Sequence, residues 1–440
     1  MARIRRGEWR NWAGNQRMRP VTIERPQLEQ ELSSIVERAH SRRQKVKAVG
    51  TGHSFTSTAL TDGHLIDMSG LDRLVEVDRE ASTVTVGAGI AISDLNQTLH
   101  GLGLAMPNLG DIAYQTISGA ISTSTHGTGR NFNGLAAQVR ALRMVTGDGS
   151  VVELTPADGP LFKAAQVGVG SLGIVSQYTL DVVSAFRLRA REGAEPLDSL
   201  LEGLDDYVDQ NDHFEFFWIP HTKWALTKRN ERTTDPAPRV GARGRAQHWY
   251  AKTFMENYAF GAVCKLGNLR PALIPRLATA LPSTGHSTTV SESYQVFASK
   301  RIVRFLEMEY SIPREHCADA LRRLRTMIDT EGHLVSFPVE VRFTAADDIT
   351  LSTAHGRESA YIAVHMHIGT PWPRVEAYFR GVAAIMADYG GRPHWGKMHF
   401  LGHNELSRLY PKWDEFLAAR EHFDPTRTFG NAYTANCFGP

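Results

Sequence analysis

Hydrophobic positions in the first 180 residues recur at strand and helix spacings in turn. Residues 20–50 predict a strand, an amphipathic helix and a second strand, because two apolar runs flank a stretch with helical periodicity. Further on, two apolar runs flank Gly147-Asp148-Gly149, which is typical of a hairpin turn. The pattern therefore indicates an α+β region. The expected strands are 21–23, 45–49, 65–68, 74–77, 83–86, 139–145 and 151–154, and the expected helices are 27–41 and 94–102.

The pattern changes after about residue 185. A dense aromatic strand is expected at 213–219, and a helix follows residues 310–315 and continues to 328. Two alternating strands, 337–343 and 360–368, precede a helix at 375–389. This order predicts a second domain built on a mixed sheet. We expect domains at 1–184 and 185–400, with a separate tail at 401–440.

Composition narrows the class of protein. The 49 Lys and Arg against 47 Asp and Glu give a net charge of +2, so no strong field favours nucleic acid or an acidic membrane. The three cysteines are odd in number and widely spaced, which indicates a reducing compartment rather than a disulfide framework. No secretory apolar segment follows the basic N-terminus, and no apolar run reaches the ~18 residues of a membrane span. We therefore expect a soluble cytoplasmic protein.

Three loops rich in Gly, Ser and Thr carry the first candidate chemistry. Gly50-Thr51-Gly52-His53-Ser54 follows an expected strand, and its glycines allow backbone N–H groups to approach an anion. By itself this loop is either a phosphate cradle with a reactive imidazole or a glycine-rich turn with a solvated histidine. Two further runs, 107–129 and 168–175, favour the cradle, because together they offer many donors to a long polyanionic cofactor. None has the spacing of a Rossmann or P-loop site.

The same motifs resemble the FAD-binding domain of the vanillyl-alcohol-oxidase flavoproteins. In the C-terminal half, residues 338–344 with Asp347-Asp348, and then Gly391-Arg392-Pro393-His394-Trp395-Gly396-Lys397, resemble the aldonolactone oxidoreductases of that group. The resemblance implies an α+β fold with a two-part, PCMH-type FAD-binding domain and an α+β substrate-binding cap. It also implies that the tail returns to the FAD-binding domain.

The resemblance implies FAD as the cofactor, with His53 joined covalently to the flavin 8α-methyl carbon. A noncovalent neighbour of the flavin is the alternative role for His53. A second, cysteinyl link is excluded because no cysteine precedes residue 264. The expected cofactor-binding residues are Gly50, Thr51, Gly52, His53, Ser54, Gly110, Asp111, Ser118, Gly119, Thr125, Gly127, Gly173, Val175, His394 and Asn431.

Glu340 and Arg342 are the first candidates for substrate binding. At positions i and i+2 of a strand they share one face, where the guanidinium donates and the carboxylate accepts hydrogen bonds. They could clamp a polyhydroxylated substrate, or form a cross-strand ion pair on the surface. The family resemblance favours the clamp.

Lys397 and His365 complete the expected catalytic set. The resemblance places Lys397 near the reacting hydroxyl, where a cation would stabilise a developing alkoxide. His365 matches a histidine of alditol oxidases, but His367 departs from the hydroxyl residue expected there, which favours a lactone enzyme. The His-x-His pair could be half of a metal site, yet no third ligand has suitable spacing, so we expect no metal.

These assignments imply oxidation of the C2 hydroxyl of an aldono-1,4-lactone such as L-gulono-1,4-lactone, giving an ascorbate-type product. Electrons would pass from FAD to oxygen or to another acceptor, such as a cytochrome or a quinone. The nearest alternative is an alditol oxidase that acts on xylitol or sorbitol and produces hydrogen peroxide. A nicotinamide-dependent reductase on the same FAD domain and a noncatalytic flavin-storage protein are two further classes. The first would lack His53 and the His-Trp-Gly-Lys motif, and the second would not need Glu340, Arg342 and Lys397 together.

Overall fold

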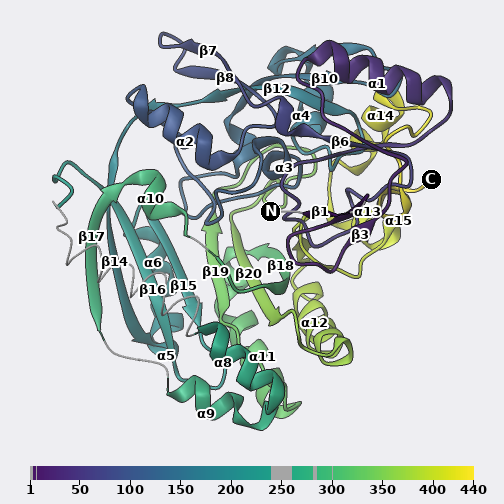
Figure 1. Cartoon of the computed structure of the whole chain (residues 1–440). Helices are drawn as coiled ribbons and strands as arrows, with labels where there is room; N and C mark the ends of the chain where they lie inside the picture. The colour runs from purple at the N-terminus through teal and green to yellow at the C-terminus, as the bar shows by residue number, and fades with distance from the viewer. Residues whose placement is uncertain (1–2, 6, 239–259, 281–284, 300) are drawn as a thin grey trace.

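The computed structural model describes residues 3–5, 7–238, 260–280, 285–299 and 301–440. Its N-terminal part holds a parallel three-stranded sheet in the order β4-β6-β5, with α1 between its first and second strands in sequence (Figure 1). Helix α1 buries Leu32, Val36 and Ala39 along one side, as its apolar spacing dictates. These elements are β4 (Thr22–Glu24), α1 (Glu29–Ser41), β5 (Val46–Val49) and β6 (His64–Asp67).

A five-stranded antiparallel sheet in the order β11-β10-β12-β8-β7 completes this part. The strands and helices expected from the sequence here are all present, with ends displaced by a residue or two. Loops that leave these elements carry the glycine-rich motifs. The elements are β7 (Leu74–Asp78), β8 (Thr83–Gly87), α2 (Ile92–Gly101), α3 (Ile117–Ser122), β10 (Val139–Val145), β11 (Val151–Leu154), α4 (Pro160–Gln166) and β12 (Ile174–Asp181).

The second part is built on an eight-stranded sheet in the order β17-β14-β16-β15-β19-β20-β18-β21. Every neighbouring pair in it is antiparallel, so the expected mixed sheet is wrong. Strands β18 and β19 do flank helix α11 and run parallel, but β20 lies between them and pairs with both. The strands are β14 (Arg187–Pro196), β15 (His213–Trp218), β16 (Trp224–Thr233), β17 (His286–Glu292), β18 (Phe305–Pro313), β19 (Val339–Thr344), β20 (Ser359–His367) and β21 (Arg392–Pro393).

The two faces of this sheet differ in polarity because strand residues alternate. On β19, Val339, Val341 and Phe343 enter a hydrophobic core shared with the helices α5, α6, α11 and α12, whereas Glu340 and Arg342 point to the other face. The sheet therefore presents a row of buried polar side chains away from its helices. The helices are α5 (Leu197–Glu202), α6 (Leu204–Asp209), α8 (Phe260–Leu269), α9 (Ile274–Thr279), α10 (Ser293–Phe297), α11 (Cys317–Thr330) and α12 (Trp372–Ala387).

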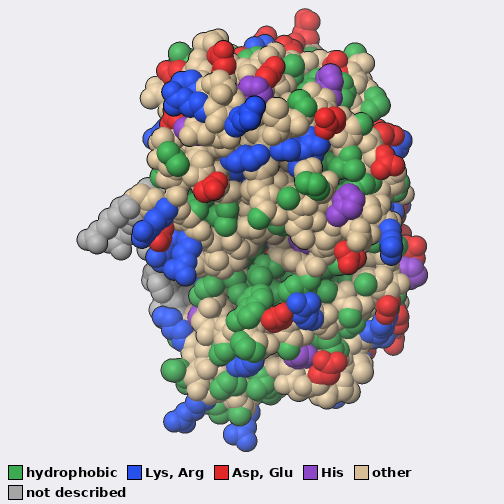
Figure 2. All heavy atoms as spheres, turned by 90° about the vertical axis from the view of Figure 1, so that its right-hand side faces the viewer, with side chains coloured by type: hydrophobic (Ala, Val, Ile, Leu, Met, Phe, Trp, Pro, Cys, Tyr) green, Lys and Arg blue, Asp and Glu red, His purple; other side chains and the backbone are tan. Residues whose placement is uncertain are grey.

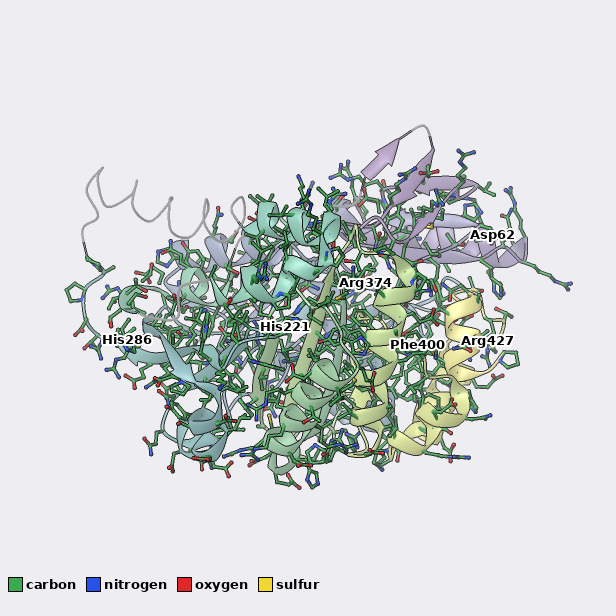
Figure 3. The ribbon with its side chains drawn as sticks, turned by 90° about the horizontal axis from the view of Figure 1, so that it is seen from below. Asp62, His221, His286, Arg374, Phe400 and Arg427 are labelled. Carbon is green, nitrogen blue, oxygen red and sulfur yellow. The ribbon has the colours of Figure 1, made fainter. Side chains whose placement is uncertain are left out.

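The last forty residues form three helices that pack on the N-terminal part. Trp413, Phe416 and Phe438 belong to the same core as Phe162 of α4, and α14 contacts α4. Figure 3 shows Arg427 of this segment at the opposite side of the molecule from His286, at the start of β17. The helices are α13 (His403–Leu409), α14 (Trp413–Phe423) and α15 (Ala432–Phe438), and the remaining short strands are β1 (Arg3–Arg5), β2 (Glu8–Arg10), β3 (Arg17–Met18), β9 (Leu104–Ala105) and β13 (Val183–Ser184).

Side chains of both charges are interspersed over the face seen in Figure 2, with hydrophobic side chains gathered across its middle. Within the described residues, no helix is long and apolar enough to cross a bilayer. The three cysteines, Cys264, Cys317 and Cys437, are free and buried.

Candidate active site

A first cavity lies between the glycine-rich loops of the N-terminal part, with about 940 Å³ of space between protein atoms. The loop after β5 turns at Gly52, whose φ of +69° is unfavourable for residues with a Cβ. A Cβ on Gly50 would lie 2.0 Å from the Thr116 side-chain oxygen, so only glycine lets these two loops approach. The glycines of this motif therefore set the shape of the cavity wall.

The lining of the first cavity suits a polyanionic cofactor. The described residues that line it include no Asp or Glu, and they offer hydroxyls, backbone N–H groups, His53 and the buried Lys47. Lys47 donates to the carbonyl oxygens of Gly170 and Phe429, both at 2.9 Å, and burial lowers the pKa of its ammonium to about 7. This set of donors fits FAD, the cofactor that the motif resemblance implies.

His53 lies in the wall of this cavity. Its ring stacks on Trp12 at a centroid distance of 5.7 Å, and its Nδ1 lies 3.0 Å from the Thr51 hydroxyl. Burial lowers the pKa of His53 to about 4, so the imidazole is neutral at pH 7 and keeps a lone pair. The His53 ring is thus half-buried and held by Trp12 and Thr51 in the cavity wall.

The expected cofactor residues divide between two cavities. Nine line the first cavity, four line a second cavity beside it, and two line neither; Gln115 lines both, so the two are contiguous. The first group is Gly50, Thr51, Gly52, His53, Ser54, Ser118, Gly119, Gly173 and Val175. The second group is Gly110, Asp111, Thr125 and His394.

The remaining two, Gly127 and Asn431, act on the loops behind the cavities. A Cβ on Gly127 would lie 2.3 Å from the Leu109 carbonyl oxygen, so this glycine permits close packing of two loops. The Asn431 amide donates to the carbonyl oxygens of Ser57, Thr58 and Leu60 at 2.9–3.1 Å. It thereby ties the C-terminal segment to a loop that borders the first cavity.

The second cavity, with about 870 Å³ between protein atoms, lies against the polar face of the large sheet. Glu340, Arg342, His365 and Lys397, the four expected catalytic residues, all line it. The first three come from adjacent strands β19 and β20. Lys397 comes from the loop after β21, which is fixed to β18 by the backbone bonds His394 N to Glu309 O and Met398 N to Glu307 O.

Arg342 is at the centre of a buried ionic cluster rather than in a surface pair. Its guanidinium contacts Glu340, donates to Glu215 at 2.8 Å and lies 3.7 Å from Asp111. All of these except Asp111 are at most 8% exposed. Burial raises the pKa of Glu340 to about 7 against the attraction of Arg342, whereas Arg342 and Arg301 hold the pKa of Asp111 below its ordinary value despite its burial.

Glu307 joins the other two expected catalytic residues. Its carboxylate accepts a hydrogen bond from Lys397 Nζ, and the same oxygen lies 3.4 Å from His365 Nε2. Although burial lowers the pKa of Lys397 and of His365, the charge of Glu307 raises both above their ordinary values. Glu307 therefore favours the protonated forms of both side chains.

His126, Glu309 and His394 form a further buried group whose ligand atoms lie within 4.8 Å of one another. Hydrogen bonding opposes a metal here. The Gly396 N–H donates to His394 Nδ1 at 3.0 Å, which places the proton of the neutral ring on Nε2. The ammonium of Lys397 also lies 4.0 Å from Glu309. We assign this group a hydrogen-bonding role and no metal ligation.

Sequence reasoning did not single out Lys47, Gln115, His126, Arg301, Glu215, Glu307 or Glu309, which line the cavities or contact residues that do. Glu307 and Glu309 could have been found, because they alternate with apolar residues in Leu306-Glu307-Met308-Glu309-Tyr310. Two acids on one face of an otherwise apolar strand indicate a polar site. Arg301 has no comparable pattern around it.

Profiles of two known families match successive parts of the chain. The profile of the D-arabinono-1,4-lactone oxidase family matches residues 178–437, more than half of the chain. The profile of an FAD binding domain matches residues 20–155.

Curated relatives match along almost the whole length. An L-gulono-1,4-lactone dehydrogenase of Mycobacterium tuberculosis is 44% identical over 434 residues, covering 98% of this chain and 99% of that protein. An L-gulonolactone oxidase of Scyliorhinus torazame is 32% identical over 438 residues, which cover 98% of each chain. An alditol oxidase of a Streptomyces species is 29% identical over 436 residues, which cover 96% of this chain and 97% of that protein. A cholesterol oxidase structure from Brevibacterium sterolicum superposes with a TM-score of 0.83 at 18% identity, covering 99% and 98%, which shows the shared fold.

Proposed function

The chain belongs to the D-arabinono-1,4-lactone oxidase family, and on that premise we propose that it is an FAD-dependent oxidoreductase acting on aldono-1,4-lactones. The substrate we propose first is L-gulono-1,4-lactone, oxidised at its C2 hydroxyl to an ascorbate-type product. The observation that carries the proposal is the second cavity, where Glu340, Arg342, His365 and Lys397 converge beside the cavity of the FAD-binding loops.

FAD would be held by the loops of the first cavity. Gly50 to Ser54 supply backbone N–H groups and hydroxyls, and Lys47 adds a buried amine to the same cavity wall. Bound FAD provides the acceptor for the hydride that leaves the substrate carbon. We further propose that His53 forms a covalent bond to the flavin, since its low pKa keeps the imidazole neutral and nucleophilic.

The substrate would be oriented by the ionic cluster. Arg342 has a fixed fork of donors for ring and hydroxyl oxygens, and Glu340 beside it accepts from hydroxyls. Lys397 would donate to the C2 oxygen and stabilise the negative charge that develops there as the hydride departs. This role requires a protonated lysine, which the adjacent Glu307 favours.

The hydroxyl proton needs an acceptor, and Glu340 is the group best suited to accept it. Glu307 favours the protonated forms of Lys397 and His365, and a protonated side chain cannot take up a further proton. Glu340, with a pKa of about 7, is the lining carboxyl that can both lose and regain a proton near neutral pH. We therefore propose Glu340 as the general base as well as part of the clamp.

The experiment that tests the proposed function is a substrate panel under anaerobic conditions. L-Gulono-1,4-lactone and other aldono-1,4-lactones are compared with xylitol and sorbitol by the loss of flavin absorbance. Rapid reduction by lactones supports the proposal. The second candidate, an alditol oxidase, is motivated by the relative from Streptomyces, and faster reduction by xylitol or sorbitol would favour it. Reoxidation with oxygen, a quinone or cytochrome c then identifies the acceptor.

The organisation of the chain is proposed on the same basis. An FAD-binding domain at 1–184, a cap at 185–400 and a returning tail at 401–440 are supported by two hydrophobic cores, the first of which includes Trp413 and Phe438 of the tail. A cytoplasmic bacterial location is supported by three buried free thiols and by the mycobacterial relative.

A further inference from the structure

Glu307 occupies a position that the proposed chemistry does not use directly. It is 5% exposed and lies on the polar face of β18, directly opposite His365 in the register of β18 and β20. One of its oxygens accepts from Lys397 Nζ and lies 3.4 Å from His365 Nε2. A single buried carboxylate therefore joins two of the expected catalytic side chains that line the second cavity.

The hydrogen bonds around His365 define where its protons lie. Its Nδ1 is 3.1 Å from the carbonyl oxygen of Pro338, which can only accept, so Nδ1 carries a proton. Its Nε2 faces Glu307, and this approach is attractive only with a proton between the two. Because Lys397 donates to the same carboxylate, Glu307 stays ionised and the proton remains on His365.

We propose that Glu307 is a positioning residue that holds Lys397 and His365 as cations. Lys397 then acts as a charged hydrogen-bond donor to the substrate oxygen, and neither side chain acts as a base. This inference rests on the proposed function for its kinetic consequence, but the charge states themselves do not depend on any substrate. The loop of Lys397 is anchored on the same residue, since Met398 N donates to the Glu307 carbonyl oxygen at 2.9 Å.

The charges that surround this group leave Glu307 as the main partner of Lys397. Glu309 lies farther from Lys397 Nζ, at 4.0 Å, and one of its oxygens lies 3.4 Å from His126 Nε2. The charge of Glu307 also contributes most to raising the pKa of Lys397 against its burial. The titratable and charged groups that face the site from the packed elements are Asp111, His126, Arg301, Glu309, Glu340, Arg342, His365, His394 and Lys397.

Removal of Glu307 should move the high-pH loss of activity to lower pH. Lys397 would then be a buried ammonium with the more distant Glu309 and Asp111 as its acidic neighbours, so its pKa falls. A group that must be protonated to act loses activity as pH rises through its pKa. In wild type this loss lies above about pH 10, the ordinary range of lysine. In Glu307→Gln it should move down into the range that can be measured.

The experiment compares wild type with Glu307→Gln and a matched control, Glu215→Gln. Glu215 is an equally buried carboxylate of the same sheet, but it contacts Arg342 and Lys228 and neither Lys397 nor His365. Anaerobic flavin reduction by L-gulono-1,4-lactone is measured from about pH 6 to about pH 10. We expect Glu307→Gln to lose rate with a high-pH limb at least one pH unit below that of wild type, so that the limb enters the measured range. In Glu215→Gln the limb stays in place. A limb that does not move, or that moves equally in both variants, overturns the proposal.

A second measurement needs no substrate and no variant of Glu307. NMR of ¹³C,¹⁵N-histidine protein, with the His365 signal assigned through His365→Gln, reports the charge of this ring directly. Wild-type His365 should be an imidazolium at pH 7, and a neutral His365 overturns the proposal even if Glu307→Gln does not fold. Where Glu307→Gln folds, the His365 ring in it should titrate at least one pH unit lower than in wild type. If no lactone reduces the flavin but His365 is cationic, the proposed function fails and the role of Glu307 stands.

Discussion

Replacement of Lys397 tests directly whether a cation at this position speeds flavin reduction. In Lys397→Met the aliphatic stem is largely retained while the ammonium is removed. The ammonium contacts Glu307 and lies 4.0 Å from Glu309, so the substitution removes a hydrogen-bond donor that the buried carboxylates of β18 hold at the wall of the cavity. Loss of one donor to a developing oxyanion typically costs 10²–10³ in rate, or about 2.7–4 kcal/mol. We expect flavin reduction to slow by about that factor.

The assay is anaerobic stopped-flow reduction of the flavin by L-gulono-1,4-lactone. Flavin content and the oxidised flavin spectrum should not change, because Lys397 lines the second cavity and not the first. Lys397→Arg keeps the charge but differs in shape and hydration, so partial recovery is expected. A Lys397→Met protein that reduces its flavin at the wild-type rate would refute the reasoning. The lysine would then be a structural partner of Glu307.

Three further outcomes are expected. Acid-denatured protein should retain its yellow colour, because we propose that neutral His53 bonds the flavin. The variant His53→Ala should bind FAD noncovalently. Release of all colour from denatured wild type would contradict the covalent link. Aldono-1,4-lactones should be preferred to xylitol and sorbitol, and a tenfold preference for the alditols in kcat/KM, about 1.4 kcal/mol, would reverse the assignment. The rate of flavin reduction should rise about tenfold per pH unit below about pH 7 and level off above it, because Glu340 must be ionised to accept a proton. A pH-independent rate, or the same pH profile in Glu340→Gln, would exclude Glu340 as the base.

Local patterning was sufficient to predict the N-terminal elements. Strands β10 and β11 were expected at the observed residues, because their apolar runs are bounded by a glycine turn that permits few alternatives. The shared face of Glu340 and Arg342 followed from strand periodicity alone. Their burial did not follow, because it depends on packing against a distant part of the chain, as in the backbone bond from Gly129 N to Phe343 O.

The order of strands in the large sheet could not be read from local sequence. The β–α–β order of β18, α11 and β19 is typical of a parallel pair, but β20 inserts between the two strands and makes every pairing antiparallel. The same long-range pairing places His365 opposite Glu307, fifty-eight positions apart in the chain. Ionic contacts of this kind are set by sheet register, which leaves no local pattern.

The division between the two cavities was also beyond the sequence. Asp111 and His394 are among the expected cofactor-binding residues, and both line the second cavity, where Asp111 pairs with Arg301 at 3.2 Å. A loop can contribute neighbouring residues to two sites, and only the fold shows which side chain faces which space.

The central claim is that the FAD of this protein is reduced by an aldono-1,4-lactone. Its most direct test is to mix the purified holoprotein with L-gulono-1,4-lactone in the absence of oxygen and to follow flavin absorbance. We expect loss of the flavin band within the time of turnover, with recovery when an electron acceptor is added. A flavin that remains oxidised with every aldono-1,4-lactone but is bleached by NADPH, or by xylitol or sorbitol alone, would contradict the claim.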